Sequence, residues 1–302
     1  MRIKKTGFAC LLMVSIIIGA SANANAEVYK YYDKLNSKQK KAYKVMEKKI
    51  EKAESAPLSV NVKCNYRDVI RAIEAVSADR ADLFSGNIVV DFDYTKNTTR
   101  PVFSEINGKK ISKKLRSIVN NTKLEGESDL ETAINIHDFI INNTEYDFSS
   151  DDSFTDKFSM KGALLNNQAV CEGYARTFKY ICDRYNLPCM LVTGYSQNPG
   201  NNAKRERHMW NYLKIDGTWY AVDTTWDDNL TEGDNICYDY FLVGSDTPDS
   251  ANIPFSESHL RNPDFFNFDI DKVKGFSYPS LSRESFFGND SNIYEYINAN
   301  YN

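Results

Sequence analysis

The sequence predicts an α+β fold in which a mainly helical region precedes a compact segment of helix and antiparallel sheet. Apolar side chains recur at helical spacing in three early segments, residues 30–55, 66–76 and 109–121. Residues typical of strands are concentrated later, at residues 189–195, 208–215, 218–225 and 238–243. We therefore expect a helical region over residues 27–125, a core over 126–245, and a C-terminal extension over 246–302 that packs on the core.

Residues 1–26 have the three parts of an export signal. Basic residues come first, residues 8–18 form an apolar run too short to span a bilayer comfortably, and Ala24-Asn25-Ala26 has the small-residue pattern of a cleavage site. We expect a secreted, extracellular protein whose mature chain begins near Glu27 and has no membrane span. An uncleaved membrane anchor is the alternative interpretation of the same residues.

The charge of the chain argues against a nucleic-acid partner. The formal net charge is −4, and removal of residues 1–26 takes away three basic side chains and no acidic one, so the mature chain carries −7. Proteins that bind nucleic acids generally present a net basic surface to the phosphates. The first helical segment is rich in lysine, which suggests an anionic partner, but a solvated helix face is the simpler interpretation.

Five cysteines remain after the expected cleavage, and an odd number in an exported protein leaves at least one thiol free. A disulfide scaffold would also be denser in cysteine. Cys182 has the pattern of an inert packing thiol on a helix face. Disulfide pairing stays open among Cys64, Cys182, Cys189 and Cys237.

Several local signals mark where the earlier elements begin. Ser37 is the expected N-cap of the first helix, and residues 88–94 predict a strand. Ser128, with Glu131 three positions later, has the pattern of a capping box, so a helix should begin there. That helix contains His137 within its apolar pattern, which indicates a packing or surface histidine rather than a ligand.

Residues 167–185 predict a loop that enters a helix with Cys171 at its start. A neutral thiol is a poor nucleophile, so a cysteine enzyme must form the thiolate. A helix N-terminus favours negative charge because the backbone N–H groups and the helix dipole are directed toward it. Cys171 is therefore a candidate nucleophile, although a lone cysteine is more often a small buried hydrophobe.

The following hairpin brings a histidine and an aspartate to one face of a sheet. Asp216-Gly217 predicts a two-residue turn, which pairs residue 210 with 223 and residue 208 with 225. Residues two apart share a face, so His208 and Asp223 become diagonal neighbours about 7–8 Å apart. A shift of one residue would put them on opposite faces. Histidine is the usual partner of a catalytic thiolate, and a carboxylate can orient the imidazole. Asp223 alone has the simpler interpretation of a charge at a strand end.

This stretch resembles the transglutaminase-like core of secreted bacterial proteins. The likeness extends from about Ile136 to Val243, and its motifs are Tyr146-Asp147, Gly162-Ala163-Leu164, Val170-Cys171-Glu172-Gly173-Tyr174-Ala175, Gly194-Tyr195, His208-Met209-Trp210-Asn211 and Tyr220-Ala221-Val222-Asp223. The resemblance implies a papain-like core, in which a helix headed by the cysteine packs on an antiparallel sheet. It also implies Cys171 as nucleophile, His208 as general base and acid, and Asp223 as the residue that orients the imidazole.

The resemblance further implies thioester chemistry on a glutamine or peptide amide, completed by an amine or by water. The partner would be a protein or peptide substrate, with cell-wall or surface association as one option, and neither a cofactor nor a metal is expected. The candidates for substrate binding are Trp210, Trp226 and Tyr174. Met209 departs from the family, which commonly has alanine there. The second oxyanion donor stays open, with Gln168 and the backbone N–H of Cys171 as candidates.

A non-catalytic binding module on the same fold is the alternative function. It would be favoured if the triad were broken, whereas all three residues are present. A papain-type protease fits less well, because its histidine follows the cysteine by about 130–150 residues, whereas His208 follows Cys171 by 37. The acidic segment that begins at Asp227 misses the spacing of an EF-hand calcium loop, so a solvated turn is the simpler interpretation.

Overall fold

The computed structural model describes residues 28–85, 90–95, 97–149, 155–197, 205–228, 236–261, 278–288 and 290–301. The expected signal peptide lies outside these ranges. Within them, no helix combines the length and the apolar character needed to cross a bilayer. The fold mixes helices with sheets, as the sequence predicts.

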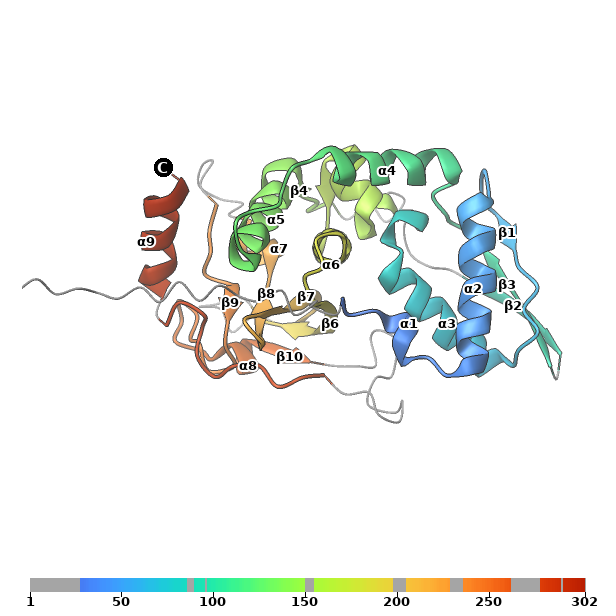
Figure 1. Ribbon diagram of the computed structural model, residues 1–302. Helices are drawn as coiled ribbons and strands as arrows, with labels where there is room; N and C mark the ends of the chain where they lie inside the picture. The colour runs from blue at the N-terminus through green and yellow to red at the C-terminus, as the bar shows by residue number, and fades with distance from the viewer. Residues whose placement is uncertain are drawn as a thin grey trace, which may run out of the picture.

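The N-terminal region occupies the right-hand part of Figure 1 and consists mainly of helices with a small sheet. The helices are α1 (Tyr31–Lys34), α2 (Ser37–Lys52), α3 (Tyr66–Asp79) and α4 (Lys109–Asn121), with a 3-10 turn η1 (Ala81–Leu83) after α3. The strands β1 (Leu58–Ser59), β2 (Val90–Thr95) and β3 (Thr98–Phe103) pair antiparallel in the order β1-β3-β2. The predicted segments 66–76 and 109–121 correspond to α3 and α4, whereas the predicted segment 30–55 is divided into α1 and α2.

Helix α2 begins one residue earlier than the sequence prediction, because its N-cap is Asn36 and not Ser37. The Asn36 side chain accepts hydrogen bonds from the backbone N–H groups of Lys38 and Gln39, and the Gln39 side chain accepts one from the Asn36 N–H. Asn36 and Gln39 thus form a reciprocal capping box, which satisfies more backbone donors than a lone serine would.

The middle of the chain leads to a helix that begins with a cysteine. Its elements are α5 (Asp129–Asn143), β4 (Glu145–Tyr146), η2 (Thr155–Phe158), the π-helical turn η3 (Gly162–Asn166), β5 (Gln168–Ala169) and α6 (Cys171–Arg184). Ser128 caps α5 by accepting a hydrogen bond from the Glu131 N–H, as predicted. The predicted capping box is not formed, because the Glu131 carboxylate accepts from the N–H of Glu127 instead of Ser128. The short strands β4 and β5 pair in parallel directly before α6. In Figure 1, α6 is seen end-on above the strands of the main sheet.

The main sheet is antiparallel and has the strand order β10-β6-β7-β8-β9. Its strands are β6 (Cys189–Ser196), β7 (Glu206–Ile215), β8 (Thr218–Val222), β9 (Phe241–Val243) and β10 (His259–Arg261). Both residues of the Asp216-Gly217 turn have positive φ, 49° and 83°, as a two-residue hairpin turn of this type requires. Residue 211 pairs with 222 and 215 with 218, which confirms the predicted register.

The prediction that the second hairpin strand extends to residue 225 was wrong. Strand β8 ends at Val222, and the chain turns at once into the short helix α7 (Thr224–Asp227). The reason is the side chain of Asp223, which accepts hydrogen bonds from the N–H groups of Thr225 and Trp226 and so caps α7. Asp223 therefore lies directly beyond the last paired residue of β8.

Asn211 of β7 joins the sheet to helix α6. Its amide donates to the carbonyl of Ala175 in α6 at 3.1 Å and to the carbonyl of Met190 in β6 at 3.2 Å. The side chain is buried, so loss of these bonds would leave polar backbone groups without partners. This contact fixes the first turns of α6 relative to β7.

The C-terminal region contributes to the main sheet. It contains α8 (Phe255–Ser258), β10 and, at the left in Figure 1, α9 (Asp290–Tyr301). Strand β10 pairs with β6, and His259 lies opposite Ser196. No local sequence pattern predicts the individual elements of this extension, and β10 has only three residues.

The hydrophobic core is continuous across residue 125. One core cluster includes Met46 of α2 and Val76 of α3 together with Met190 of β6 and Trp210 of β7. The hydroxyl of Tyr31 in α1 also contacts β6, where it receives the N–H of Leu191 at 3.0 Å. The N-terminal region is thus packed directly against the sheet.

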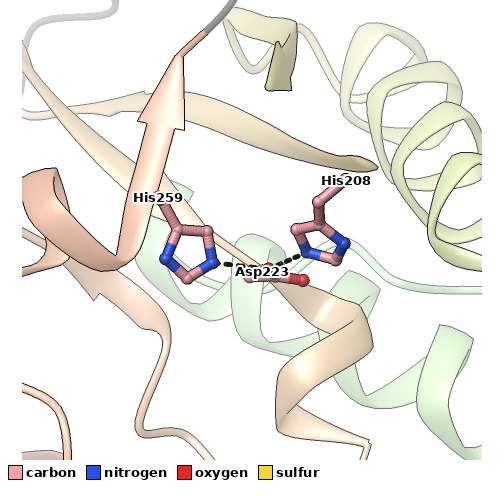
Figure 2. Close-up of side chains that lie close together, drawn as sticks. All are labelled: His208, Asp223 and His259. Carbon is pink, nitrogen blue, oxygen red and sulfur yellow. Dashed lines mark hydrogen bonds and ion pairs between the residues drawn. The ribbon is translucent and has the colours of Figure 1, made fainter. Parts of the chain in front are cut away.

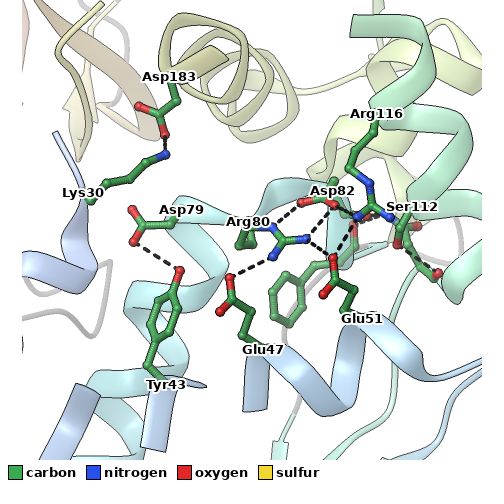
Figure 3. Close-up of polar contacts among 12 residues, drawn as sticks. Lys30, Tyr43, Glu47, Glu51, Asp79, Arg80, Asp82, Ser112, Arg116 and Asp183 are labelled. Atoms are coloured by element: carbon green, nitrogen blue, oxygen red, sulfur yellow. Dashed lines mark hydrogen bonds and ion pairs between the residues drawn. The ribbon is translucent and has the colours of Figure 1, made fainter. Parts of the chain in front are cut away.

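A buried polar network ties the N-terminal helices together (Figure 3). Asp82 of η1 accepts two hydrogen bonds from Arg80, at 2.9 and 3.1 Å, and one from Arg116 of α4 at 2.6 Å. Arg80 also contacts Glu47 and Glu51 of α2. The Asp82 side chain is completely buried, so its carboxylate has lost its hydration. The hydrogen bonds from the two guanidinium groups offset this loss.

Replacement of Asp82 by alanine should lower the free energy of unfolding by about 3 kcal/mol, because both arginines lose their buried partner. Glu51→Ala, on the more exposed side of the same network, should cost less than about 1 kcal/mol. Urea unfolding followed by circular dichroism measures both values. Equal small losses would contradict the prediction.

Candidate active site

Cys171 is the first residue of α6, as predicted, and its side chain is partly exposed. This position places the side chain at the helix end where the backbone N–H groups are unpaired. The small size of Gly173 serves close packing inside the protein, since a Cβ there would lie 2.7 Å from both the Ala169 Cβ and the Lys157 carbonyl oxygen. This close approach fixes the start of α6 on the preceding loop.

His208 of β7 interacts with both Asp223 and Cys171. Its Nε2 hydrogen-bonds Oδ2 of Asp223 (Figure 2), and its ring also interacts with the thiol of Cys171. Burial opposes the charged imidazole, but the charge and hydrogen bond of Asp223, followed by those of Cys171, raise the pKa of His208 to about 10. The three residues singled out in the sequence are therefore brought together.

Asp223 is a buried carboxylate whose two oxygens receive four hydrogen bonds. Oδ1 accepts the N–H groups of Thr225 and Trp226 at 3.1 and 3.3 Å. Oδ2 accepts Nε2 of His208 and Nε2 of His259, the latter at 3.1 Å. Burial raises the pKa of Asp223, but the two imidazoles outweigh it and hold the pKa well below its usual range. Asp223 is therefore ionised throughout the neutral pH range.

His259 is a site residue that the sequence reasoning missed. It is one of only three histidines in the chain, and that scarcity was the only signal that could have pointed to it. Its ring is buried against aromatic side chains, stacked on Phe255 at 4.1 Å between ring centroids and near Trp226 at 4.5 Å. Burial lowers the pKa of His259 below 6.5, so its ring is neutral at neutral pH.

Two imidazole nitrogens and a carboxylate oxygen in the described residues lie close enough to hold a metal ion. These ligand atoms of His208, Asp223 and His259 are all within 4.8 Å of one another. Transition metals accept such a set. However, both imidazoles already hydrogen-bond the same oxygen, Oδ2 of Asp223. An ion would therefore have to replace both of these bonds.

The aromatic residues predicted to bind substrate differ in their exposure. Trp210 is buried and lies 6.0 Å from the His208 ring, and Tyr174 is buried with its hydroxyl bonded to the Thr144 carbonyl. Trp226 is partly exposed and lies 5.7 Å from the His208 ring. Of the three, only Trp226 is open to a ligand in this conformation.

A further aromatic pair consists of the partly buried Tyr146 and the exposed Phe148, and no sequence pattern predicts a role for it. Phe148 is 74% exposed, and its ring lies 4.9 Å from that of Tyr146. Burial, followed by an electrostatic interaction with Cys171, raises the pKa of Tyr146. An exposed apolar ring of this kind is a possible contact for a ligand.

The five cysteines in the described residues all carry free thiols, so Cys171 is not held in a disulfide. Cys182 and Cys189 are buried neighbours, and burial and the nearby Cys189 raise the pKa of Cys182. Cys237 is partly exposed, and burial raises its pKa to about 11. Cys171 and Cys237 are therefore the two thiols that a reagent in solution can reach most easily.

His137 of α5 packs inside the protein, between the rings of Tyr238 and Phe241. Its Nδ1 lies 3.0 Å from Asp138 and its Nε2 lies 3.1 Å from Asp227 of α7. Burial opposes its charge, but the two carboxylates outweigh it and raise the pKa of His137 to about 9.

The three histidines should titrate at very different pH values: His208 near 10, His137 near 9 and His259 below 6.5. Nitrogen-15 NMR of the imidazoles, assigned with His137→Phe, measures all three. Because the folded pKa of His208 exceeds its unfolded value, the charged ring stabilises the fold below about pH 6.5, and this contribution is lost as the pH rises toward 10. Three pKa values near 6.5 would contradict the site geometry.

Comparison with known proteins finds a family match in the middle of the chain. The sequence profile of the transglutaminase-like superfamily matches residues 116–224. Kyphoscoliosis peptidase of Homo sapiens and that of Mus musculus are each 29% identical to this chain over 124 residues, which cover 39% of this chain and 19% of the relative. The chain thus spans about a fifth of the length of these curated relatives.

A solved structure described as that of a TGase is 13% identical, with 75% of this chain and 72% of that chain covered and a TM-score of 0.34. The superfamily profile includes helix α6, strand β7 and Asp223. Residues 116–224 of this chain are therefore similar to the transglutaminase-like superfamily.

Proposed function

We propose that this protein is a thiol enzyme that acts on peptide or glutamine amides through a thioester on Cys171. His208 acts as general base and acid, and Asp223 orients its ring. The proposal rests on one observation: the imidazole of His208 hydrogen-bonds the carboxylate of Asp223 and also interacts with the thiol of Cys171. Similarity to the superfamily supports an enzyme of this general kind.

The reaction proceeds in two steps with His208 exchanging one proton. The Cys171 thiolate attacks the amide carbonyl, and the C–N bond breaks as the His208 imidazolium protonates the leaving nitrogen, which departs as ammonia or an amine. Neutral His208 then takes a proton from water or from a second amine, which attacks the thioester and releases an acid or a new amide. The thiolate and the imidazolium are thereby restored.

Hydrolysis is the outcome that we favour over amine transfer. The curated relatives are named peptidases, and the partly exposed Cys171 admits water. Amine transfer needs a site that excludes water while it admits an amine. Tyr146, Phe148 and Trp226, which are near the thiol or His208, are the proposed contacts for the substrate chain.

A secreted location with protein or peptide substrates, including surface-associated ones, fits the export signal in the sequence and is part of the proposal. A binding module without catalysis is the second candidate function. The charged state of His208 favours catalysis, because a binding module has no need of an imidazolium beside a thiol.

Cys171 should react with iodoacetamide at pH 7 at least about 100-fold faster than Cys237, because His208 interacts with the first thiol, whereas burial raises the pKa of the second to about 11. Peptide mass spectrometry measures both sites in one molecule, so Cys237 is an internal control. His208→Ala should slow the labelling of Cys171 at least about 10-fold and leave Cys237 unchanged. Equal, slow labelling of both cysteines would favour the binding module.

Incubation with a peptide library and a dansylated amine should release ammonia or new amino termini without much amine incorporation. Asp223→Asn should lower this activity by about 10²- to 10⁴-fold, because the imidazole loses its orienting charge. Cys171→Ala should abolish it. Incorporation of the amine at the rate of ammonia release would replace hydrolysis with transamidation.

A further inference from the structure

His259 reaches the candidate active site from outside the segment that matches the superfamily. That segment ends at residue 224, whereas His259 begins β10, at the edge of the main sheet. Its Nε2 lies 3.1 Å from Oδ2 of Asp223, the same oxygen that His208 bonds (Figure 2). The two imidazoles thus converge on one oxygen from two different strands.

The hydrogen bonds around His259 fix its tautomer. An ionised carboxylate can only accept, so Nε2 of His259 must carry the proton. The other nitrogen, Nδ1, lies 2.9 Å from Oγ of Ser258, whose hydroxyl can donate to it or to the Phe255 carbonyl at 3.3 Å. The neutral ring with a proton on Nε2 satisfies both contacts, whereas the opposite tautomer would place a lone pair against the carboxylate.

The surroundings of His259 do not by themselves require a polar residue. Phe255 stacks on the ring at an interplanar angle of 11°, and Trp226, Trp210 and Tyr240 lie within 6 Å between ring centroids. A phenyl ring would pack as well in such a cage, and burial of a polar ring costs free energy unless its nitrogens are bonded. The bond to Asp223 is the interaction that a phenyl ring could not replace.

We propose that His259 is a positioning residue that holds the Asp223 carboxylate in line with His208 by donating its Nε2–H to Oδ2. This inference rests on the proposed function, because it assigns His259 a role in keeping His208 charged beside the Cys171 thiolate. With His259 and the two backbone N–H groups of α7 in place, the carboxylate cannot rotate away from His208 without breaking three other hydrogen bonds.

The test compares the pH dependence of Cys171 labelling by iodoacetamide in three variants. His259→Phe keeps the aromatic packing and removes the donor, and His259→Gln keeps a donor on a side chain of similar reach. Phe255→Leu is the matched control, since it disturbs the same cage and leaves both histidines intact. The charged and titratable groups that act on His259 are Asp223, His208 and Asp249, with Tyr240 in ring contact, and all are unchanged in these variants.

We expect His259→Phe to slow labelling at about pH 6 roughly 10-fold and to move the labelling midpoint upward by about one pH unit. His259→Gln should stay within about 3-fold of the wild-type rate, and Phe255→Leu should lower the melting temperature while it keeps the wild-type profile. A wild-type profile for His259→Phe, or equal shifts in His259→Phe and Phe255→Leu, would overturn the inference. If His208→Ala also labels like the wild type, the proposed function itself fails.

A measurement on the unmodified protein covers the case in which His259→Phe does not fold. Nitrogen-15 NMR of the full chain should show one neutral histidine with its proton on Nε2 over the neutral pH range. This signal should be the one that changes in Ser258→Ala, since that variant removes the donor to Nδ1. A proton on Nδ1, or a charged His259 at pH 7, would overturn the inference without any active-site variant.

Discussion

The buried carboxylate of Asp223 is the interaction on which the rest of the site depends. It joins three separate segments: His208 from β7, the first turn of α7, and His259 from β10. Asp223 is almost completely buried, and a buried carboxylate is stable only when its oxygens accept hydrogen bonds. The four hydrogen bonds meet that requirement and at the same time fix the direction of the His208 ring. The same hydrogen bonds therefore both stabilise the buried charge of Asp223 and orient the candidate general base, His208.

The local part of this arrangement was predictable because short-range rules determine it. A two-residue turn at Asp216-Gly217 admits one register, and that register places residue 223 beside the face of His208. Helix α6 begins at Cys171 although no side chain caps its N-terminus. The pairing of β4 with β5 holds the loop that precedes the helix. The sequence prediction failed at the end of β8, where the capping strength of Asp223 outweighed the β-propensity of the following threonines.

The remaining parts of the site depend on contacts that no local pattern encodes. His259 is 36 residues from Asp223 in sequence, and the strand that carries it has three residues. Its position follows from the pairing of β10 with β6, which is decided by the closure of the whole sheet. Phe148 lies in an irregular segment, and its place beside Tyr146 depends on the short pairing of β4 with β5. Periodicity and turn chemistry describe neighbours along the chain, and these contacts are between neighbours in space.

The N-terminal region belongs to the same mechanical unit as the site, because it holds the helix that carries Cys171. Lys179 of α6 is completely buried, and its ammonium group donates to the Tyr29 carbonyl at 3.0 Å and to Asp183 at 2.8 Å. Asn211 fixes the earlier turns of α6 on the sheet. The helix is therefore held on one side by β7, which carries His208, and on the other by the start of the N-terminal region. Since a displacement of about 1 Å can cost a catalytic site about 100-fold in rate, this double attachment is what a preorganised thiol requires.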